Sequence, residues 1–302
     1  MTEPSGILII NKHVGVTSHD IVGKIRRLFG TRRVGHTGTL DPLASGVLVV
    51  LVGRAAKAAE YLVADRKEYR AGLRLGLTTD TEDITGTVLT RSEELPDEAL
   101  VLSAARQFVG ELQQIPPMYS ALKKDGQKLC DLARRGVVVE REPRRVTIHS
   151  LVCTPTDEAS DYLLDVTCSS GTYIRTLCAD LGAALGCGGV MASLERRRTG
   201  SFSLEESRTV AELEAMSTEE RLACLIPTER LFEPLPSLCL PAFFERLCRG
   251  GCELYQKKLR VSYEVGQRVR LCSAEGVFFA LGEVRDYPDG TAIKALKLFD
   301  LG

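Results

Sequence analysis

The segment from Tyr69 to Leu75 alternates strictly between two kinds of side chain. Every second residue from Tyr69 is apolar, and the residues between them are Arg70, Gly72 and Arg74. Successive side chains of a β-strand point to opposite faces of a sheet, so this pattern predicts a strand with one buried and one basic, exposed face. Such a strand needs partner strands beside it and further elements to cover its apolar face.

Other segments supply both kinds of element. Apolar runs predict strands at Ile7–Ile10, Val47–Val52, Val146–Cys153 and Tyr162–Cys168, the last two as a pair. Apolar residues at helical spacing predict helices at Ser18–Phe29, Asp97–Val109, Gln127–Arg135 and Tyr173–Leu185. Ser18 and Asp97 are the expected N-caps. We therefore expect an α+β protein with a mixed or antiparallel sheet and flanking helices.

The chain length and one proline-containing stretch indicate two domains. A chain of 302 residues is longer than one small domain needs. The stretch Pro227–Pro241 is a candidate boundary, and short strands around several glycines follow it. We expect a larger domain at residues 1–235 and a small β-rich accessory domain at residues 236–302.

Composition excludes several classes of protein. The ten cysteines are scattered, and the closest pair, Cys248 and Cys252, has no histidine near it because the last one is His149. This spacing predicts that the cysteines do not form a metal site. We expect them to be reduced thiols. The longest apolar run, Val47–Val52, is strand-sized, and no basic segment precedes the apolar run near the N-terminus. We expect no membrane span, no signal peptide and a cytoplasmic protein.

Charge is unevenly distributed along the chain. The formal net charge is −1, yet basic residues gather at 24–33, 123–145 and 196–198, whereas residues 205–233 are acidic. Such asymmetry is typical of a basic groove that binds nucleic acid on an otherwise acidic protein. Charge runs that simply face solvent are the alternative interpretation.

The segment Gly35–Gly46 carries the densest chemical signal. Its three glycines indicate a loop, and Pro42 restricts Asp41 to an extended conformation. A carboxylate held in this way can act as a nucleophile or a general base. From the residues alone an ordinary Asp-Pro turn is the alternative.

The segment GHTGTLDPLASGVL closely resembles the catalytic motif of the TruB family of bacterial tRNA pseudouridine synthases. Four further segments resemble this family in the same order: GILIINKHVGVTSHDIVGKIRR, KEYRAGLRLGLTTDTEDITG, PPMYSALKKDGQKLCDLARRGV and CSSGTYIRTLCADLG. The resemblance covers residues 6–200 and implies the pseudouridine-synthase fold. The last sixty or so residues are weakly similar to the family's small, PUA-like RNA-binding domain. Thr39 and Ser45 stand where alanine and threonine are more usual.

The resemblance implies roles for individual residues. Asp41 matches the catalytic aspartate, and Arg175 matches the arginine that pairs with it. Tyr69 matches the tyrosine that stacks on the target base and is proposed as a general base. His36 matches a histidine that helps to hold the flipped-out nucleotide, and Lys12 matches a lysine near the active site. Without the resemblance, Tyr69 would be interpreted as a core aromatic and Arg175 as a solvated charge.

The implied activity is isomerisation of the T-loop uridine at position 55 of tRNA to pseudouridine. This reaction needs no redox cofactor, and we expect a monomer with no obligatory protein partner. One alternative is a guide-RNA-dependent synthase of the dyskerin type, although the PPMYSALKKDG segment favours the TruB type. The other is a non-catalytic protein that binds or folds RNA on the same scaffold.

Overall fold

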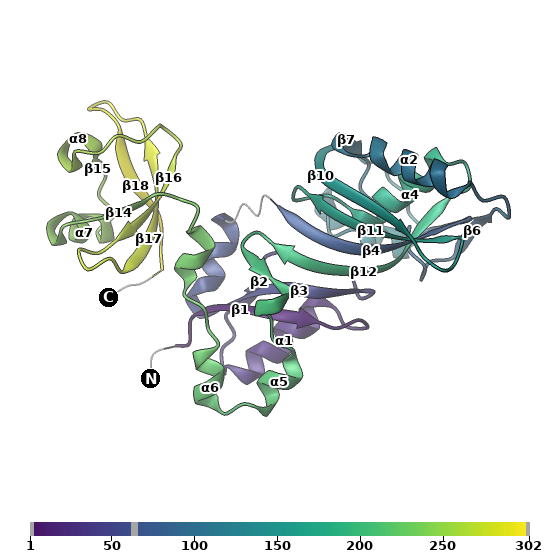
Figure 1. Ribbon diagram of the computed structural model, residues 1–302. Coiled ribbons are helices and arrows are strands. Elements are labelled where there is room, and N and C mark those ends of the chain that lie inside the picture. Colours follow the sequence, from purple (N-terminus) through teal and green to yellow (C-terminus); the bar gives the residue numbers. More distant parts are fainter. Residues whose placement is uncertain (1–2, 62–65, 300–302) are drawn as a thin grey trace.

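The computed structural model describes residues 3–61 and 66–299, and its largest sheet has nine strands (Figure 1). The main path of the sheet is β1-β3-β12-β4-β11-β10-β7, with β2 beside β3 and β13 beside β12. Its strands are β1 (Gly6–Lys12), β2 (Val34–His36), β3 (Ala44–Val52), β4 (Lys67–Leu75), β7 (Gly110–Gln114), β10 (Arg144–Pro155), β11 (Asp161–Cys168), β12 (Gly189–Thr199) and β13 (Phe202–Ser203). Only β3 and β12 pair in parallel among these described strands. The expected α+β class with a mixed sheet is confirmed.

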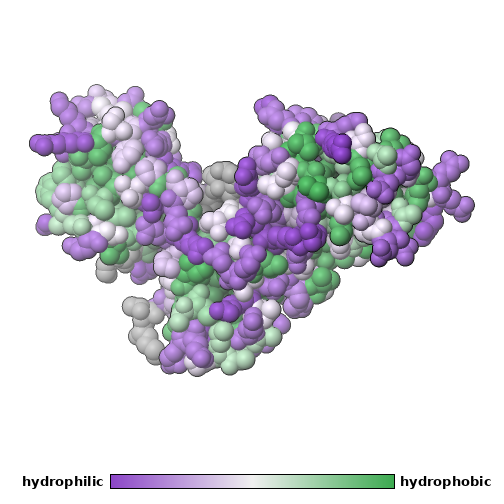
Figure 2. All heavy atoms as spheres, in the orientation of Figure 1, coloured by the Kyte–Doolittle hydropathy of each residue, from purple (hydrophilic) through white to green (hydrophobic). Residues whose placement is uncertain are grey.

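The alternating segment forms β4, in the interior of the sheet between β12 and β11. Its apolar residues are buried as expected, but its other face is not a free basic surface. Arg70 pairs with Asp165 at 2.8 Å and Arg74 with Asp161 at 2.6 Å, both across the β4–β11 pair. The arginine face of β4 is half-exposed, as expected, but carboxylates of β11 neutralise its charge. Hydrophilic side chains cover the centre of the face seen in Figure 2.

Helices α1 (Ser18–Leu28), α2 (Glu98–Gln107), α4 (Ile174–Ala184) and α5 (Val210–Ala215) contribute buried residues to one core with the sheet. Ile21 and Ile25 of α1 and Leu177 and Leu181 of α4 are completely buried in it. These are the apolar positions whose helical spacing is visible in the sequence. Three of the four predicted helices therefore have the expected extent to within two residues.

Two local expectations need correction. Thr17, not Ser18, is the N-cap of α1: its hydroxyl accepts a hydrogen bond from the backbone N–H of Asp20 at 3.1 Å, and the Asp20 carboxylate accepts one from the backbone N–H of Thr17 at 2.8 Å. This reciprocal pair satisfies two donors at once, which Ser18 could not do. The fourth predicted helix is shorter than expected, because Gln127–Lys128 belong to a strand.

The remaining elements of the first 235 residues are short. They are η1 (Gly53–Tyr61), β5 (Leu77–Thr79), β6 (Val88–Arg91), β8 (Lys123–Lys124), β9 (Gln127–Lys128), α3 (Leu129–Arg134), η2 (Leu204–Glu206), α6 (Thr218–Ala223) and η3 (Thr228–Phe232). Strands β5 and β6 form one hairpin, and β8 and β9 form another. Across the described ranges no helix combines the length and apolar character needed to cross a membrane.

A second, five-stranded sheet forms the β-rich C-terminal domain, as expected (Figure 1). Its elements are β14 (Ser237–Cys239), α7 (Ala242–Arg249), β15 (Leu254–Tyr255), α8 (Gln256–Leu259), β16 (Arg268–Cys272), β17 (Phe278–Arg285) and β18 (Ala292–Leu298). Leu281 and Phe299 of this domain share an apolar core with Val47 and Val49 of β3, and Phe232 lies in the same core. The two parts are therefore packed together, and a boundary at residue 235 remains a proposal.

Candidate active site

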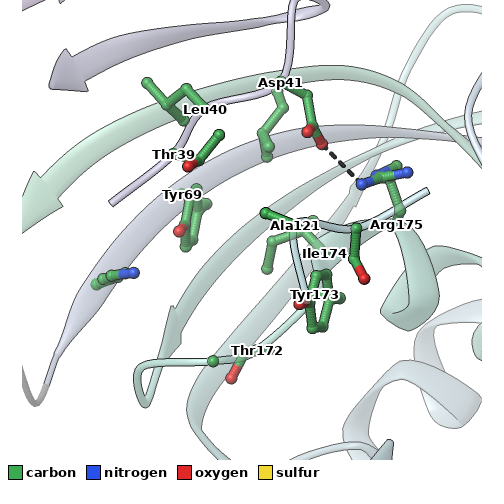
Figure 3. A pocket seen from close by; sticks show the side chains of 13 residues that line it. Thr39, Leu40, Asp41, Tyr69, Ala121, Thr172, Tyr173, Ile174 and Arg175 are labelled. Carbon is green, nitrogen blue, oxygen red and sulfur yellow. Dashed lines mark ion pairs between the residues drawn. The ribbon is translucent and has the colours of Figure 1, made fainter. Parts of the chain in front are cut away.

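A cavity of about 240 Å³ opens where β4, the N-terminus of α4 and the glycine-rich loop meet (Figure 3). Its lining residues are Thr39, Leu40, Asp41, Lys67, Tyr69, Ser120, Ala121, Gly171, Thr172, Tyr173, Ile174, Arg175 and Leu194. Asp41, Tyr69 and Arg175, which lie far apart in the sequence, thus surround one space. Residues from five segments contribute to it, so only the folded chain can form it.

Asp41 begins a turn and also carries its carboxylate to the cavity. The backbone N–H of Ala44 donates to the carbonyl of Asp41 at 3.0 Å, with Pro42 at the second position of the turn. The turn directs the side chain toward α4, where Oδ2 lies 3.0 Å from Nη2 of Arg175 (Figure 3). The turn interpretation of Asp41 is therefore correct, and the same turn places its carboxylate at the cavity, so its chemical role stays a prediction.

Arg175 is buried and held from several sides. Its side chain is only 6% exposed, so a solvated surface charge is excluded. The guanidinium donates to the carbonyl of Thr81 at 3.2 Å and to that of Tyr119 at 2.8 Å, in addition to its ion pair with Asp41. A planar guanidinium with this many partners has little freedom to turn. Arg175 therefore fixes the direction of the Asp41 carboxylate.

The loop after β5 holds one of these carbonyls in place. Oδ1 of Asp83 accepts hydrogen bonds from the hydroxyl of Thr81 at 2.9 Å, the N–H of Thr85 at 2.9 Å and the hydroxyl of Thr85 at 2.6 Å. These bonds fold the TDTEDITG segment around a single carboxylate oxygen. The segment thereby positions the Thr81 carbonyl for Arg175, a role that its sequence did not reveal.

Arg196 supports the glycine-rich loop from inside the protein. It is 1% exposed, and its guanidinium donates to the carbonyls of Val47 at 2.7 Å, Thr39 at 3.3 Å and Gly38 at 3.0 Å. Gly46 has a φ of 98°, and a Cβ there would lie 2.3 Å from the Arg196 carbonyl. The expectation that residues 196–198 belong to a basic groove is wrong for Arg196. Its guanidinium is buried and donates hydrogen bonds to backbone carbonyls instead of facing solvent.

Tyr69 lines the cavity with an almost completely buried ring, 7% exposed. Burial raises the pKa of its phenol above the usual value, and the nearby Arg196 charge only partly opposes this effect. The phenol is therefore protonated in the free protein at neutral pH. Its side chain forms part of the cavity wall together with Asp41.

Two protein-family models together match residues 26–233 of the chain. Residues 26–174 match the model of the N-terminal domain of the TruB family pseudouridylate synthases, and residues 175–233 match that of the tRNA pseudouridylate synthase B C-terminal domain. The chain belongs to the TruB family. The resemblance inferred from the sequence motifs is confirmed.

TruB-family relatives match along most of their length. The tRNA pseudouridine synthase B of Syntrophotalea carbinolica is 47% identical over 82% of this chain and 81% of its own. That of Alkaliphilus oremlandii is 41% identical over 93% and 94%. Among solved structures, a chain of a Cbf5-Nop10-Gar1 complex superposes with a TM-score of 0.73 at 25% identity, over 98% of this chain and 85% of that one.

Two further residues suggested by the TruB resemblance, Lys12 and His36, are not part of the cavity lining. Lys12 is completely buried and donates from Nζ to the carbonyls of His13 and Val16, each at 2.9 Å. Burial lowers its pKa to about 8, although the Asp41 charge acts in the opposite direction. Nδ1 of His36 accepts a hydrogen bond from the N–H of Gly38 at 3.3 Å, and burial lowers the pKa of this imidazole. Substrate contacts of both residues remain predictions.

One charged residue of the cavity was not identified from the sequence. Lys67 lines it, two positions before Tyr69 on β4 and therefore on the same face of the strand. Burial and the charge of Arg196 lower the pKa of its ammonium to about 8. The period-two pattern of β4 could have identified Lys67, because it places this side chain in phase with Tyr69.

The described residues of this TruB-family chain contain no cluster suited to a metal ion. Within 3–61 and 66–299, no group of three or more His, Cys, Asp or Glu side chains is arranged to hold one. Its ten cysteines are free thiols, half of them buried.

Proposed function

We propose that this chain is a tRNA pseudouridine-55 synthase, which isomerises the T-loop uridine at position 55 of tRNA to pseudouridine. The observation that carries the proposal is the Asp41 carboxylate, aimed by Arg175 into a cavity that Tyr69 also lines. Relatives named tRNA pseudouridine synthase B support the choice of tRNA as the substrate. They also favour a stand-alone tRNA enzyme over a guide-RNA-dependent one.

The reaction breaks the bond between C1′ of the ribose and N1 of the uracil. The uracil turns, its C5 bonds to C1′, N1 takes up a proton, and the hydrogen on C5 leaves as a proton. Asp41 drives the cleavage by attack on the sugar, attack on the base or assistance to elimination. In each case the Arg175 guanidinium, 3.0 Å away, holds the carboxylate in a fixed direction.

The uridine must leave its base stack to reach Asp41. Flipping a base out costs about a few kcal/mol, and stacking on an aromatic ring offsets part of that cost. The face of Tyr69 supplies such a platform at the cavity wall. Tyr69 is also the proposed acceptor of the C5 proton, but a phenol whose pKa is raised must first lose its own proton. This role therefore predicts a rate that rises with pH.

The tRNA T-arm is the proposed partner, and cations of the basic stretches are proposed to bind its phosphates. Lys24, Arg27, Arg32, Lys123 and Arg144 belong to the two remaining basic stretches, and the described residues provide no ion-pair partner for them. Such cations are available to phosphates of the RNA backbone. Residues 236–302 are proposed as the accessory RNA-binding domain, and the working unit as a monomer without an obligatory protein partner.

Release of the C5 hydrogen tests the proposal. Purified protein alone is incubated with a tRNA transcript whose uridines carry tritium at C5, and tritium in water is measured. We expect one equivalent per transcript, and none from a transcript with cytidine at position 55. No release from the first transcript would overturn the proposed function and favour a non-catalytic RNA-binding protein or a guide-RNA-dependent enzyme.

A further inference from the structure

Lys67 carries a charge at the cavity wall that the protein does not balance. Within residues 3–61 and 66–299 its ammonium has neither an ion-pair partner nor a hydrogen-bond acceptor. It is the first residue of β4, so the backbone of the sheet fixes its position. An unpaired ammonium in a partly buried site is unusual and needs an explanation.

The other cations of the site all have partners. Arg175 pairs with Asp41, Arg196 donates to three carbonyls, and Lys12 donates to two. Asp41 is the only carboxylate that lines the described cavity, and Arg175 already engages it. The site therefore holds more positive than negative charge, and Lys67 is its available cation.

The glycine-rich loop brings Lys67 close to a second cation. Nζ of Lys67 and Nη1 of Arg196 both lie 3.6 Å from the place that a Cβ on Gly38 would occupy. Burial and this like charge lower the pKa of Lys67 to about 8, so the charged form is held at an electrostatic disadvantage in the free protein. An anion beside Nζ would remove that disadvantage.

The substrate itself can provide this anion. The uracil and the ribose of a uridine residue are neutral at pH 7, and its only anionic group is the phosphodiester. A nucleotide whose base enters the cavity beside Tyr69 must carry its phosphates past the cavity wall. A lysine is a suitable point-charge ligand for a phosphate oxygen.

We propose that Lys67 binds a backbone phosphate of the flipped-out nucleotide and so positions that nucleotide against Asp41. The inference rests on the proposed function, because it takes the substrate to be RNA. Lys67 acts here as a positioning residue, and it takes no part in the transfer of protons. It adds an anchor for the substrate to the Asp41–Arg175 pair.

Two substitutions in the full-length protein separate binding from proton transfer. Lys67→Met keeps the length and apolar stem of the side chain and removes its charge. Lys67→Arg keeps the charge but does not release a proton at the pH of the assay. Lys57→Met is the matched control, because Lys57 is an exposed lysine on η1 and outside the cavity lining. Affinity for a T-arm stem-loop and single-turnover rate at saturating RNA are measured for each, with thermal unfolding to establish that each variant is folded.

We expect Lys67→Met to weaken RNA affinity by about ten- to a hundredfold, the range for one charge-assisted hydrogen bond. Its slope of log K against log[salt] should be shallower by about 0.7–0.9. Lys67→Arg should restore most of the affinity, and Lys57→Met should match the wild type. Unchanged affinity and slope in Lys67→Met would overturn the inference. Loss of rate without loss of affinity in both Lys67 variants would also overturn it, in favour of proton transfer.

A chemical change in the RNA gives an independent test. Stem-loops that carry a neutral methylphosphonate on the 5′ or the 3′ side of the target uridine lose the phosphate charge at one place. We expect Lys67→Met to weaken binding of the unmodified RNA. It should not weaken binding of the RNA whose methylphosphonate replaces the phosphate that Lys67 contacts, because the contact is already lost there and the two effects do not add. Equal effects on all three RNAs would contradict the inference. If the wild type binds RNA but releases no tritium, the proposed function fails instead. The comparison of the three RNAs still measures the contact between Lys67 and the phosphate.

Discussion

The hydroxyl of Ser18 forms two hydrogen bonds with the backbone of Leu40, although the two residues are 22 positions apart. It accepts from the N–H of Leu40 at 2.8 Å and donates to its carbonyl at 3.0 Å. Leu40 immediately precedes Asp41. The first turn of α1 is thereby joined to the loop that carries the candidate nucleophile.

Ser18→Ala tests this connection. The substitution leaves the buried N–H and carbonyl of Leu40 without that partner, which should lower the free energy of unfolding by about 1–3 kcal/mol. The single-turnover rate should also fall, because the Asp41 carboxylate loses part of its support. Ser217→Ala is the control: Ser217 caps α6 at the surface, so its loss should cost about 1 kcal/mol without a change in rate. Equal rates in both variants would contradict a positioning role for Ser18.

Asp41→Asn tests the candidate nucleophile. The amide keeps the size of the side chain and removes its charge, so turnover should fall by many orders of magnitude. RNA affinity should be retained, because phosphate and stacking contacts carry most of it. Affinity and single-turnover product formation are measured on the same preparation. Near-normal product would mean that Asp41 is only a turn residue.

Arg196 and Arg198 provide a matched pair of substitutions on β12. Arg196→Met leaves three carbonyls without their donor and should destabilise the protein by about 3 kcal/mol or more, since each buried acceptor left unsatisfied costs about 1–3 kcal/mol. Arg198 pairs with Glu68 at 3.4 Å and its side chain is 41% exposed, so Arg198→Met should cost about 0–1 kcal/mol. Urea unfolding measures both. Similar values would show that Arg196 does not hold the loop.

The lowered pKa of Lys67 predicts how stability depends on pH. Its folded-state pKa of about 8 lies below the ordinary value of 10.5, so between these pH values the unfolded chain binds more protons and the contribution of Lys67 to stability rises with pH. The groups facing it are Arg196 on β12 and Cys168 on β11. The stability of Lys67→Met relative to the wild type should therefore decrease from pH 8 to 10.5. A constant difference in unfolding free energy would show that the Lys67 pKa is not lowered.

The C-terminal domain should affect RNA affinity more than chemistry. Deletion near Pro236 is a poor test, because Leu281 and Phe299 pack against β1 and β3 and their loss would expose that core. Replacing the exposed Lys257 and Lys258 by Glu in the full-length chain leaves the core intact. RNA affinity should fall, while the single-turnover rate at saturating RNA should be retained. Unchanged affinity would argue against RNA contacts at α8.

Much of the fold follows from local patterns. The alternation in β4 predicts a strand because side chains alternate along any strand, whatever lies around it. The capping of α2 by Asp97 is equally local, since its carboxylate accepts from the N–H of Leu100 only three residues away at 2.8 Å. The Asp41–Arg175 pair was predicted from family motifs, and the structure contains it.

Other features depend on residues that are distant in sequence. Ser18 has the composition of a helix cap, but Thr17 and Asp20 form a reciprocal pair that displaces it, and its hydroxyl turns to Leu40 instead. Arg196 stands in a run of three arginines that indicates a charged surface. Its acceptor on Gly38 is 158 positions away, so only the β3–β12 pairing shows that it is internal.

The sequence alone determines which residue types are available and which segments form strands and helices, because those preferences act over a few neighbouring residues. The tertiary structure decides which charges are left without a partner. The arginines on the half-exposed face of β4 are neutralised by carboxylates of β11, whereas Lys67 on the same strand has no ion-pair partner among residues 3–61 and 66–299. Whether a charge is neutralised depends on the charged and polar groups nearest to it. These groups come from several segments of the chain, which become neighbours only when the chain has folded.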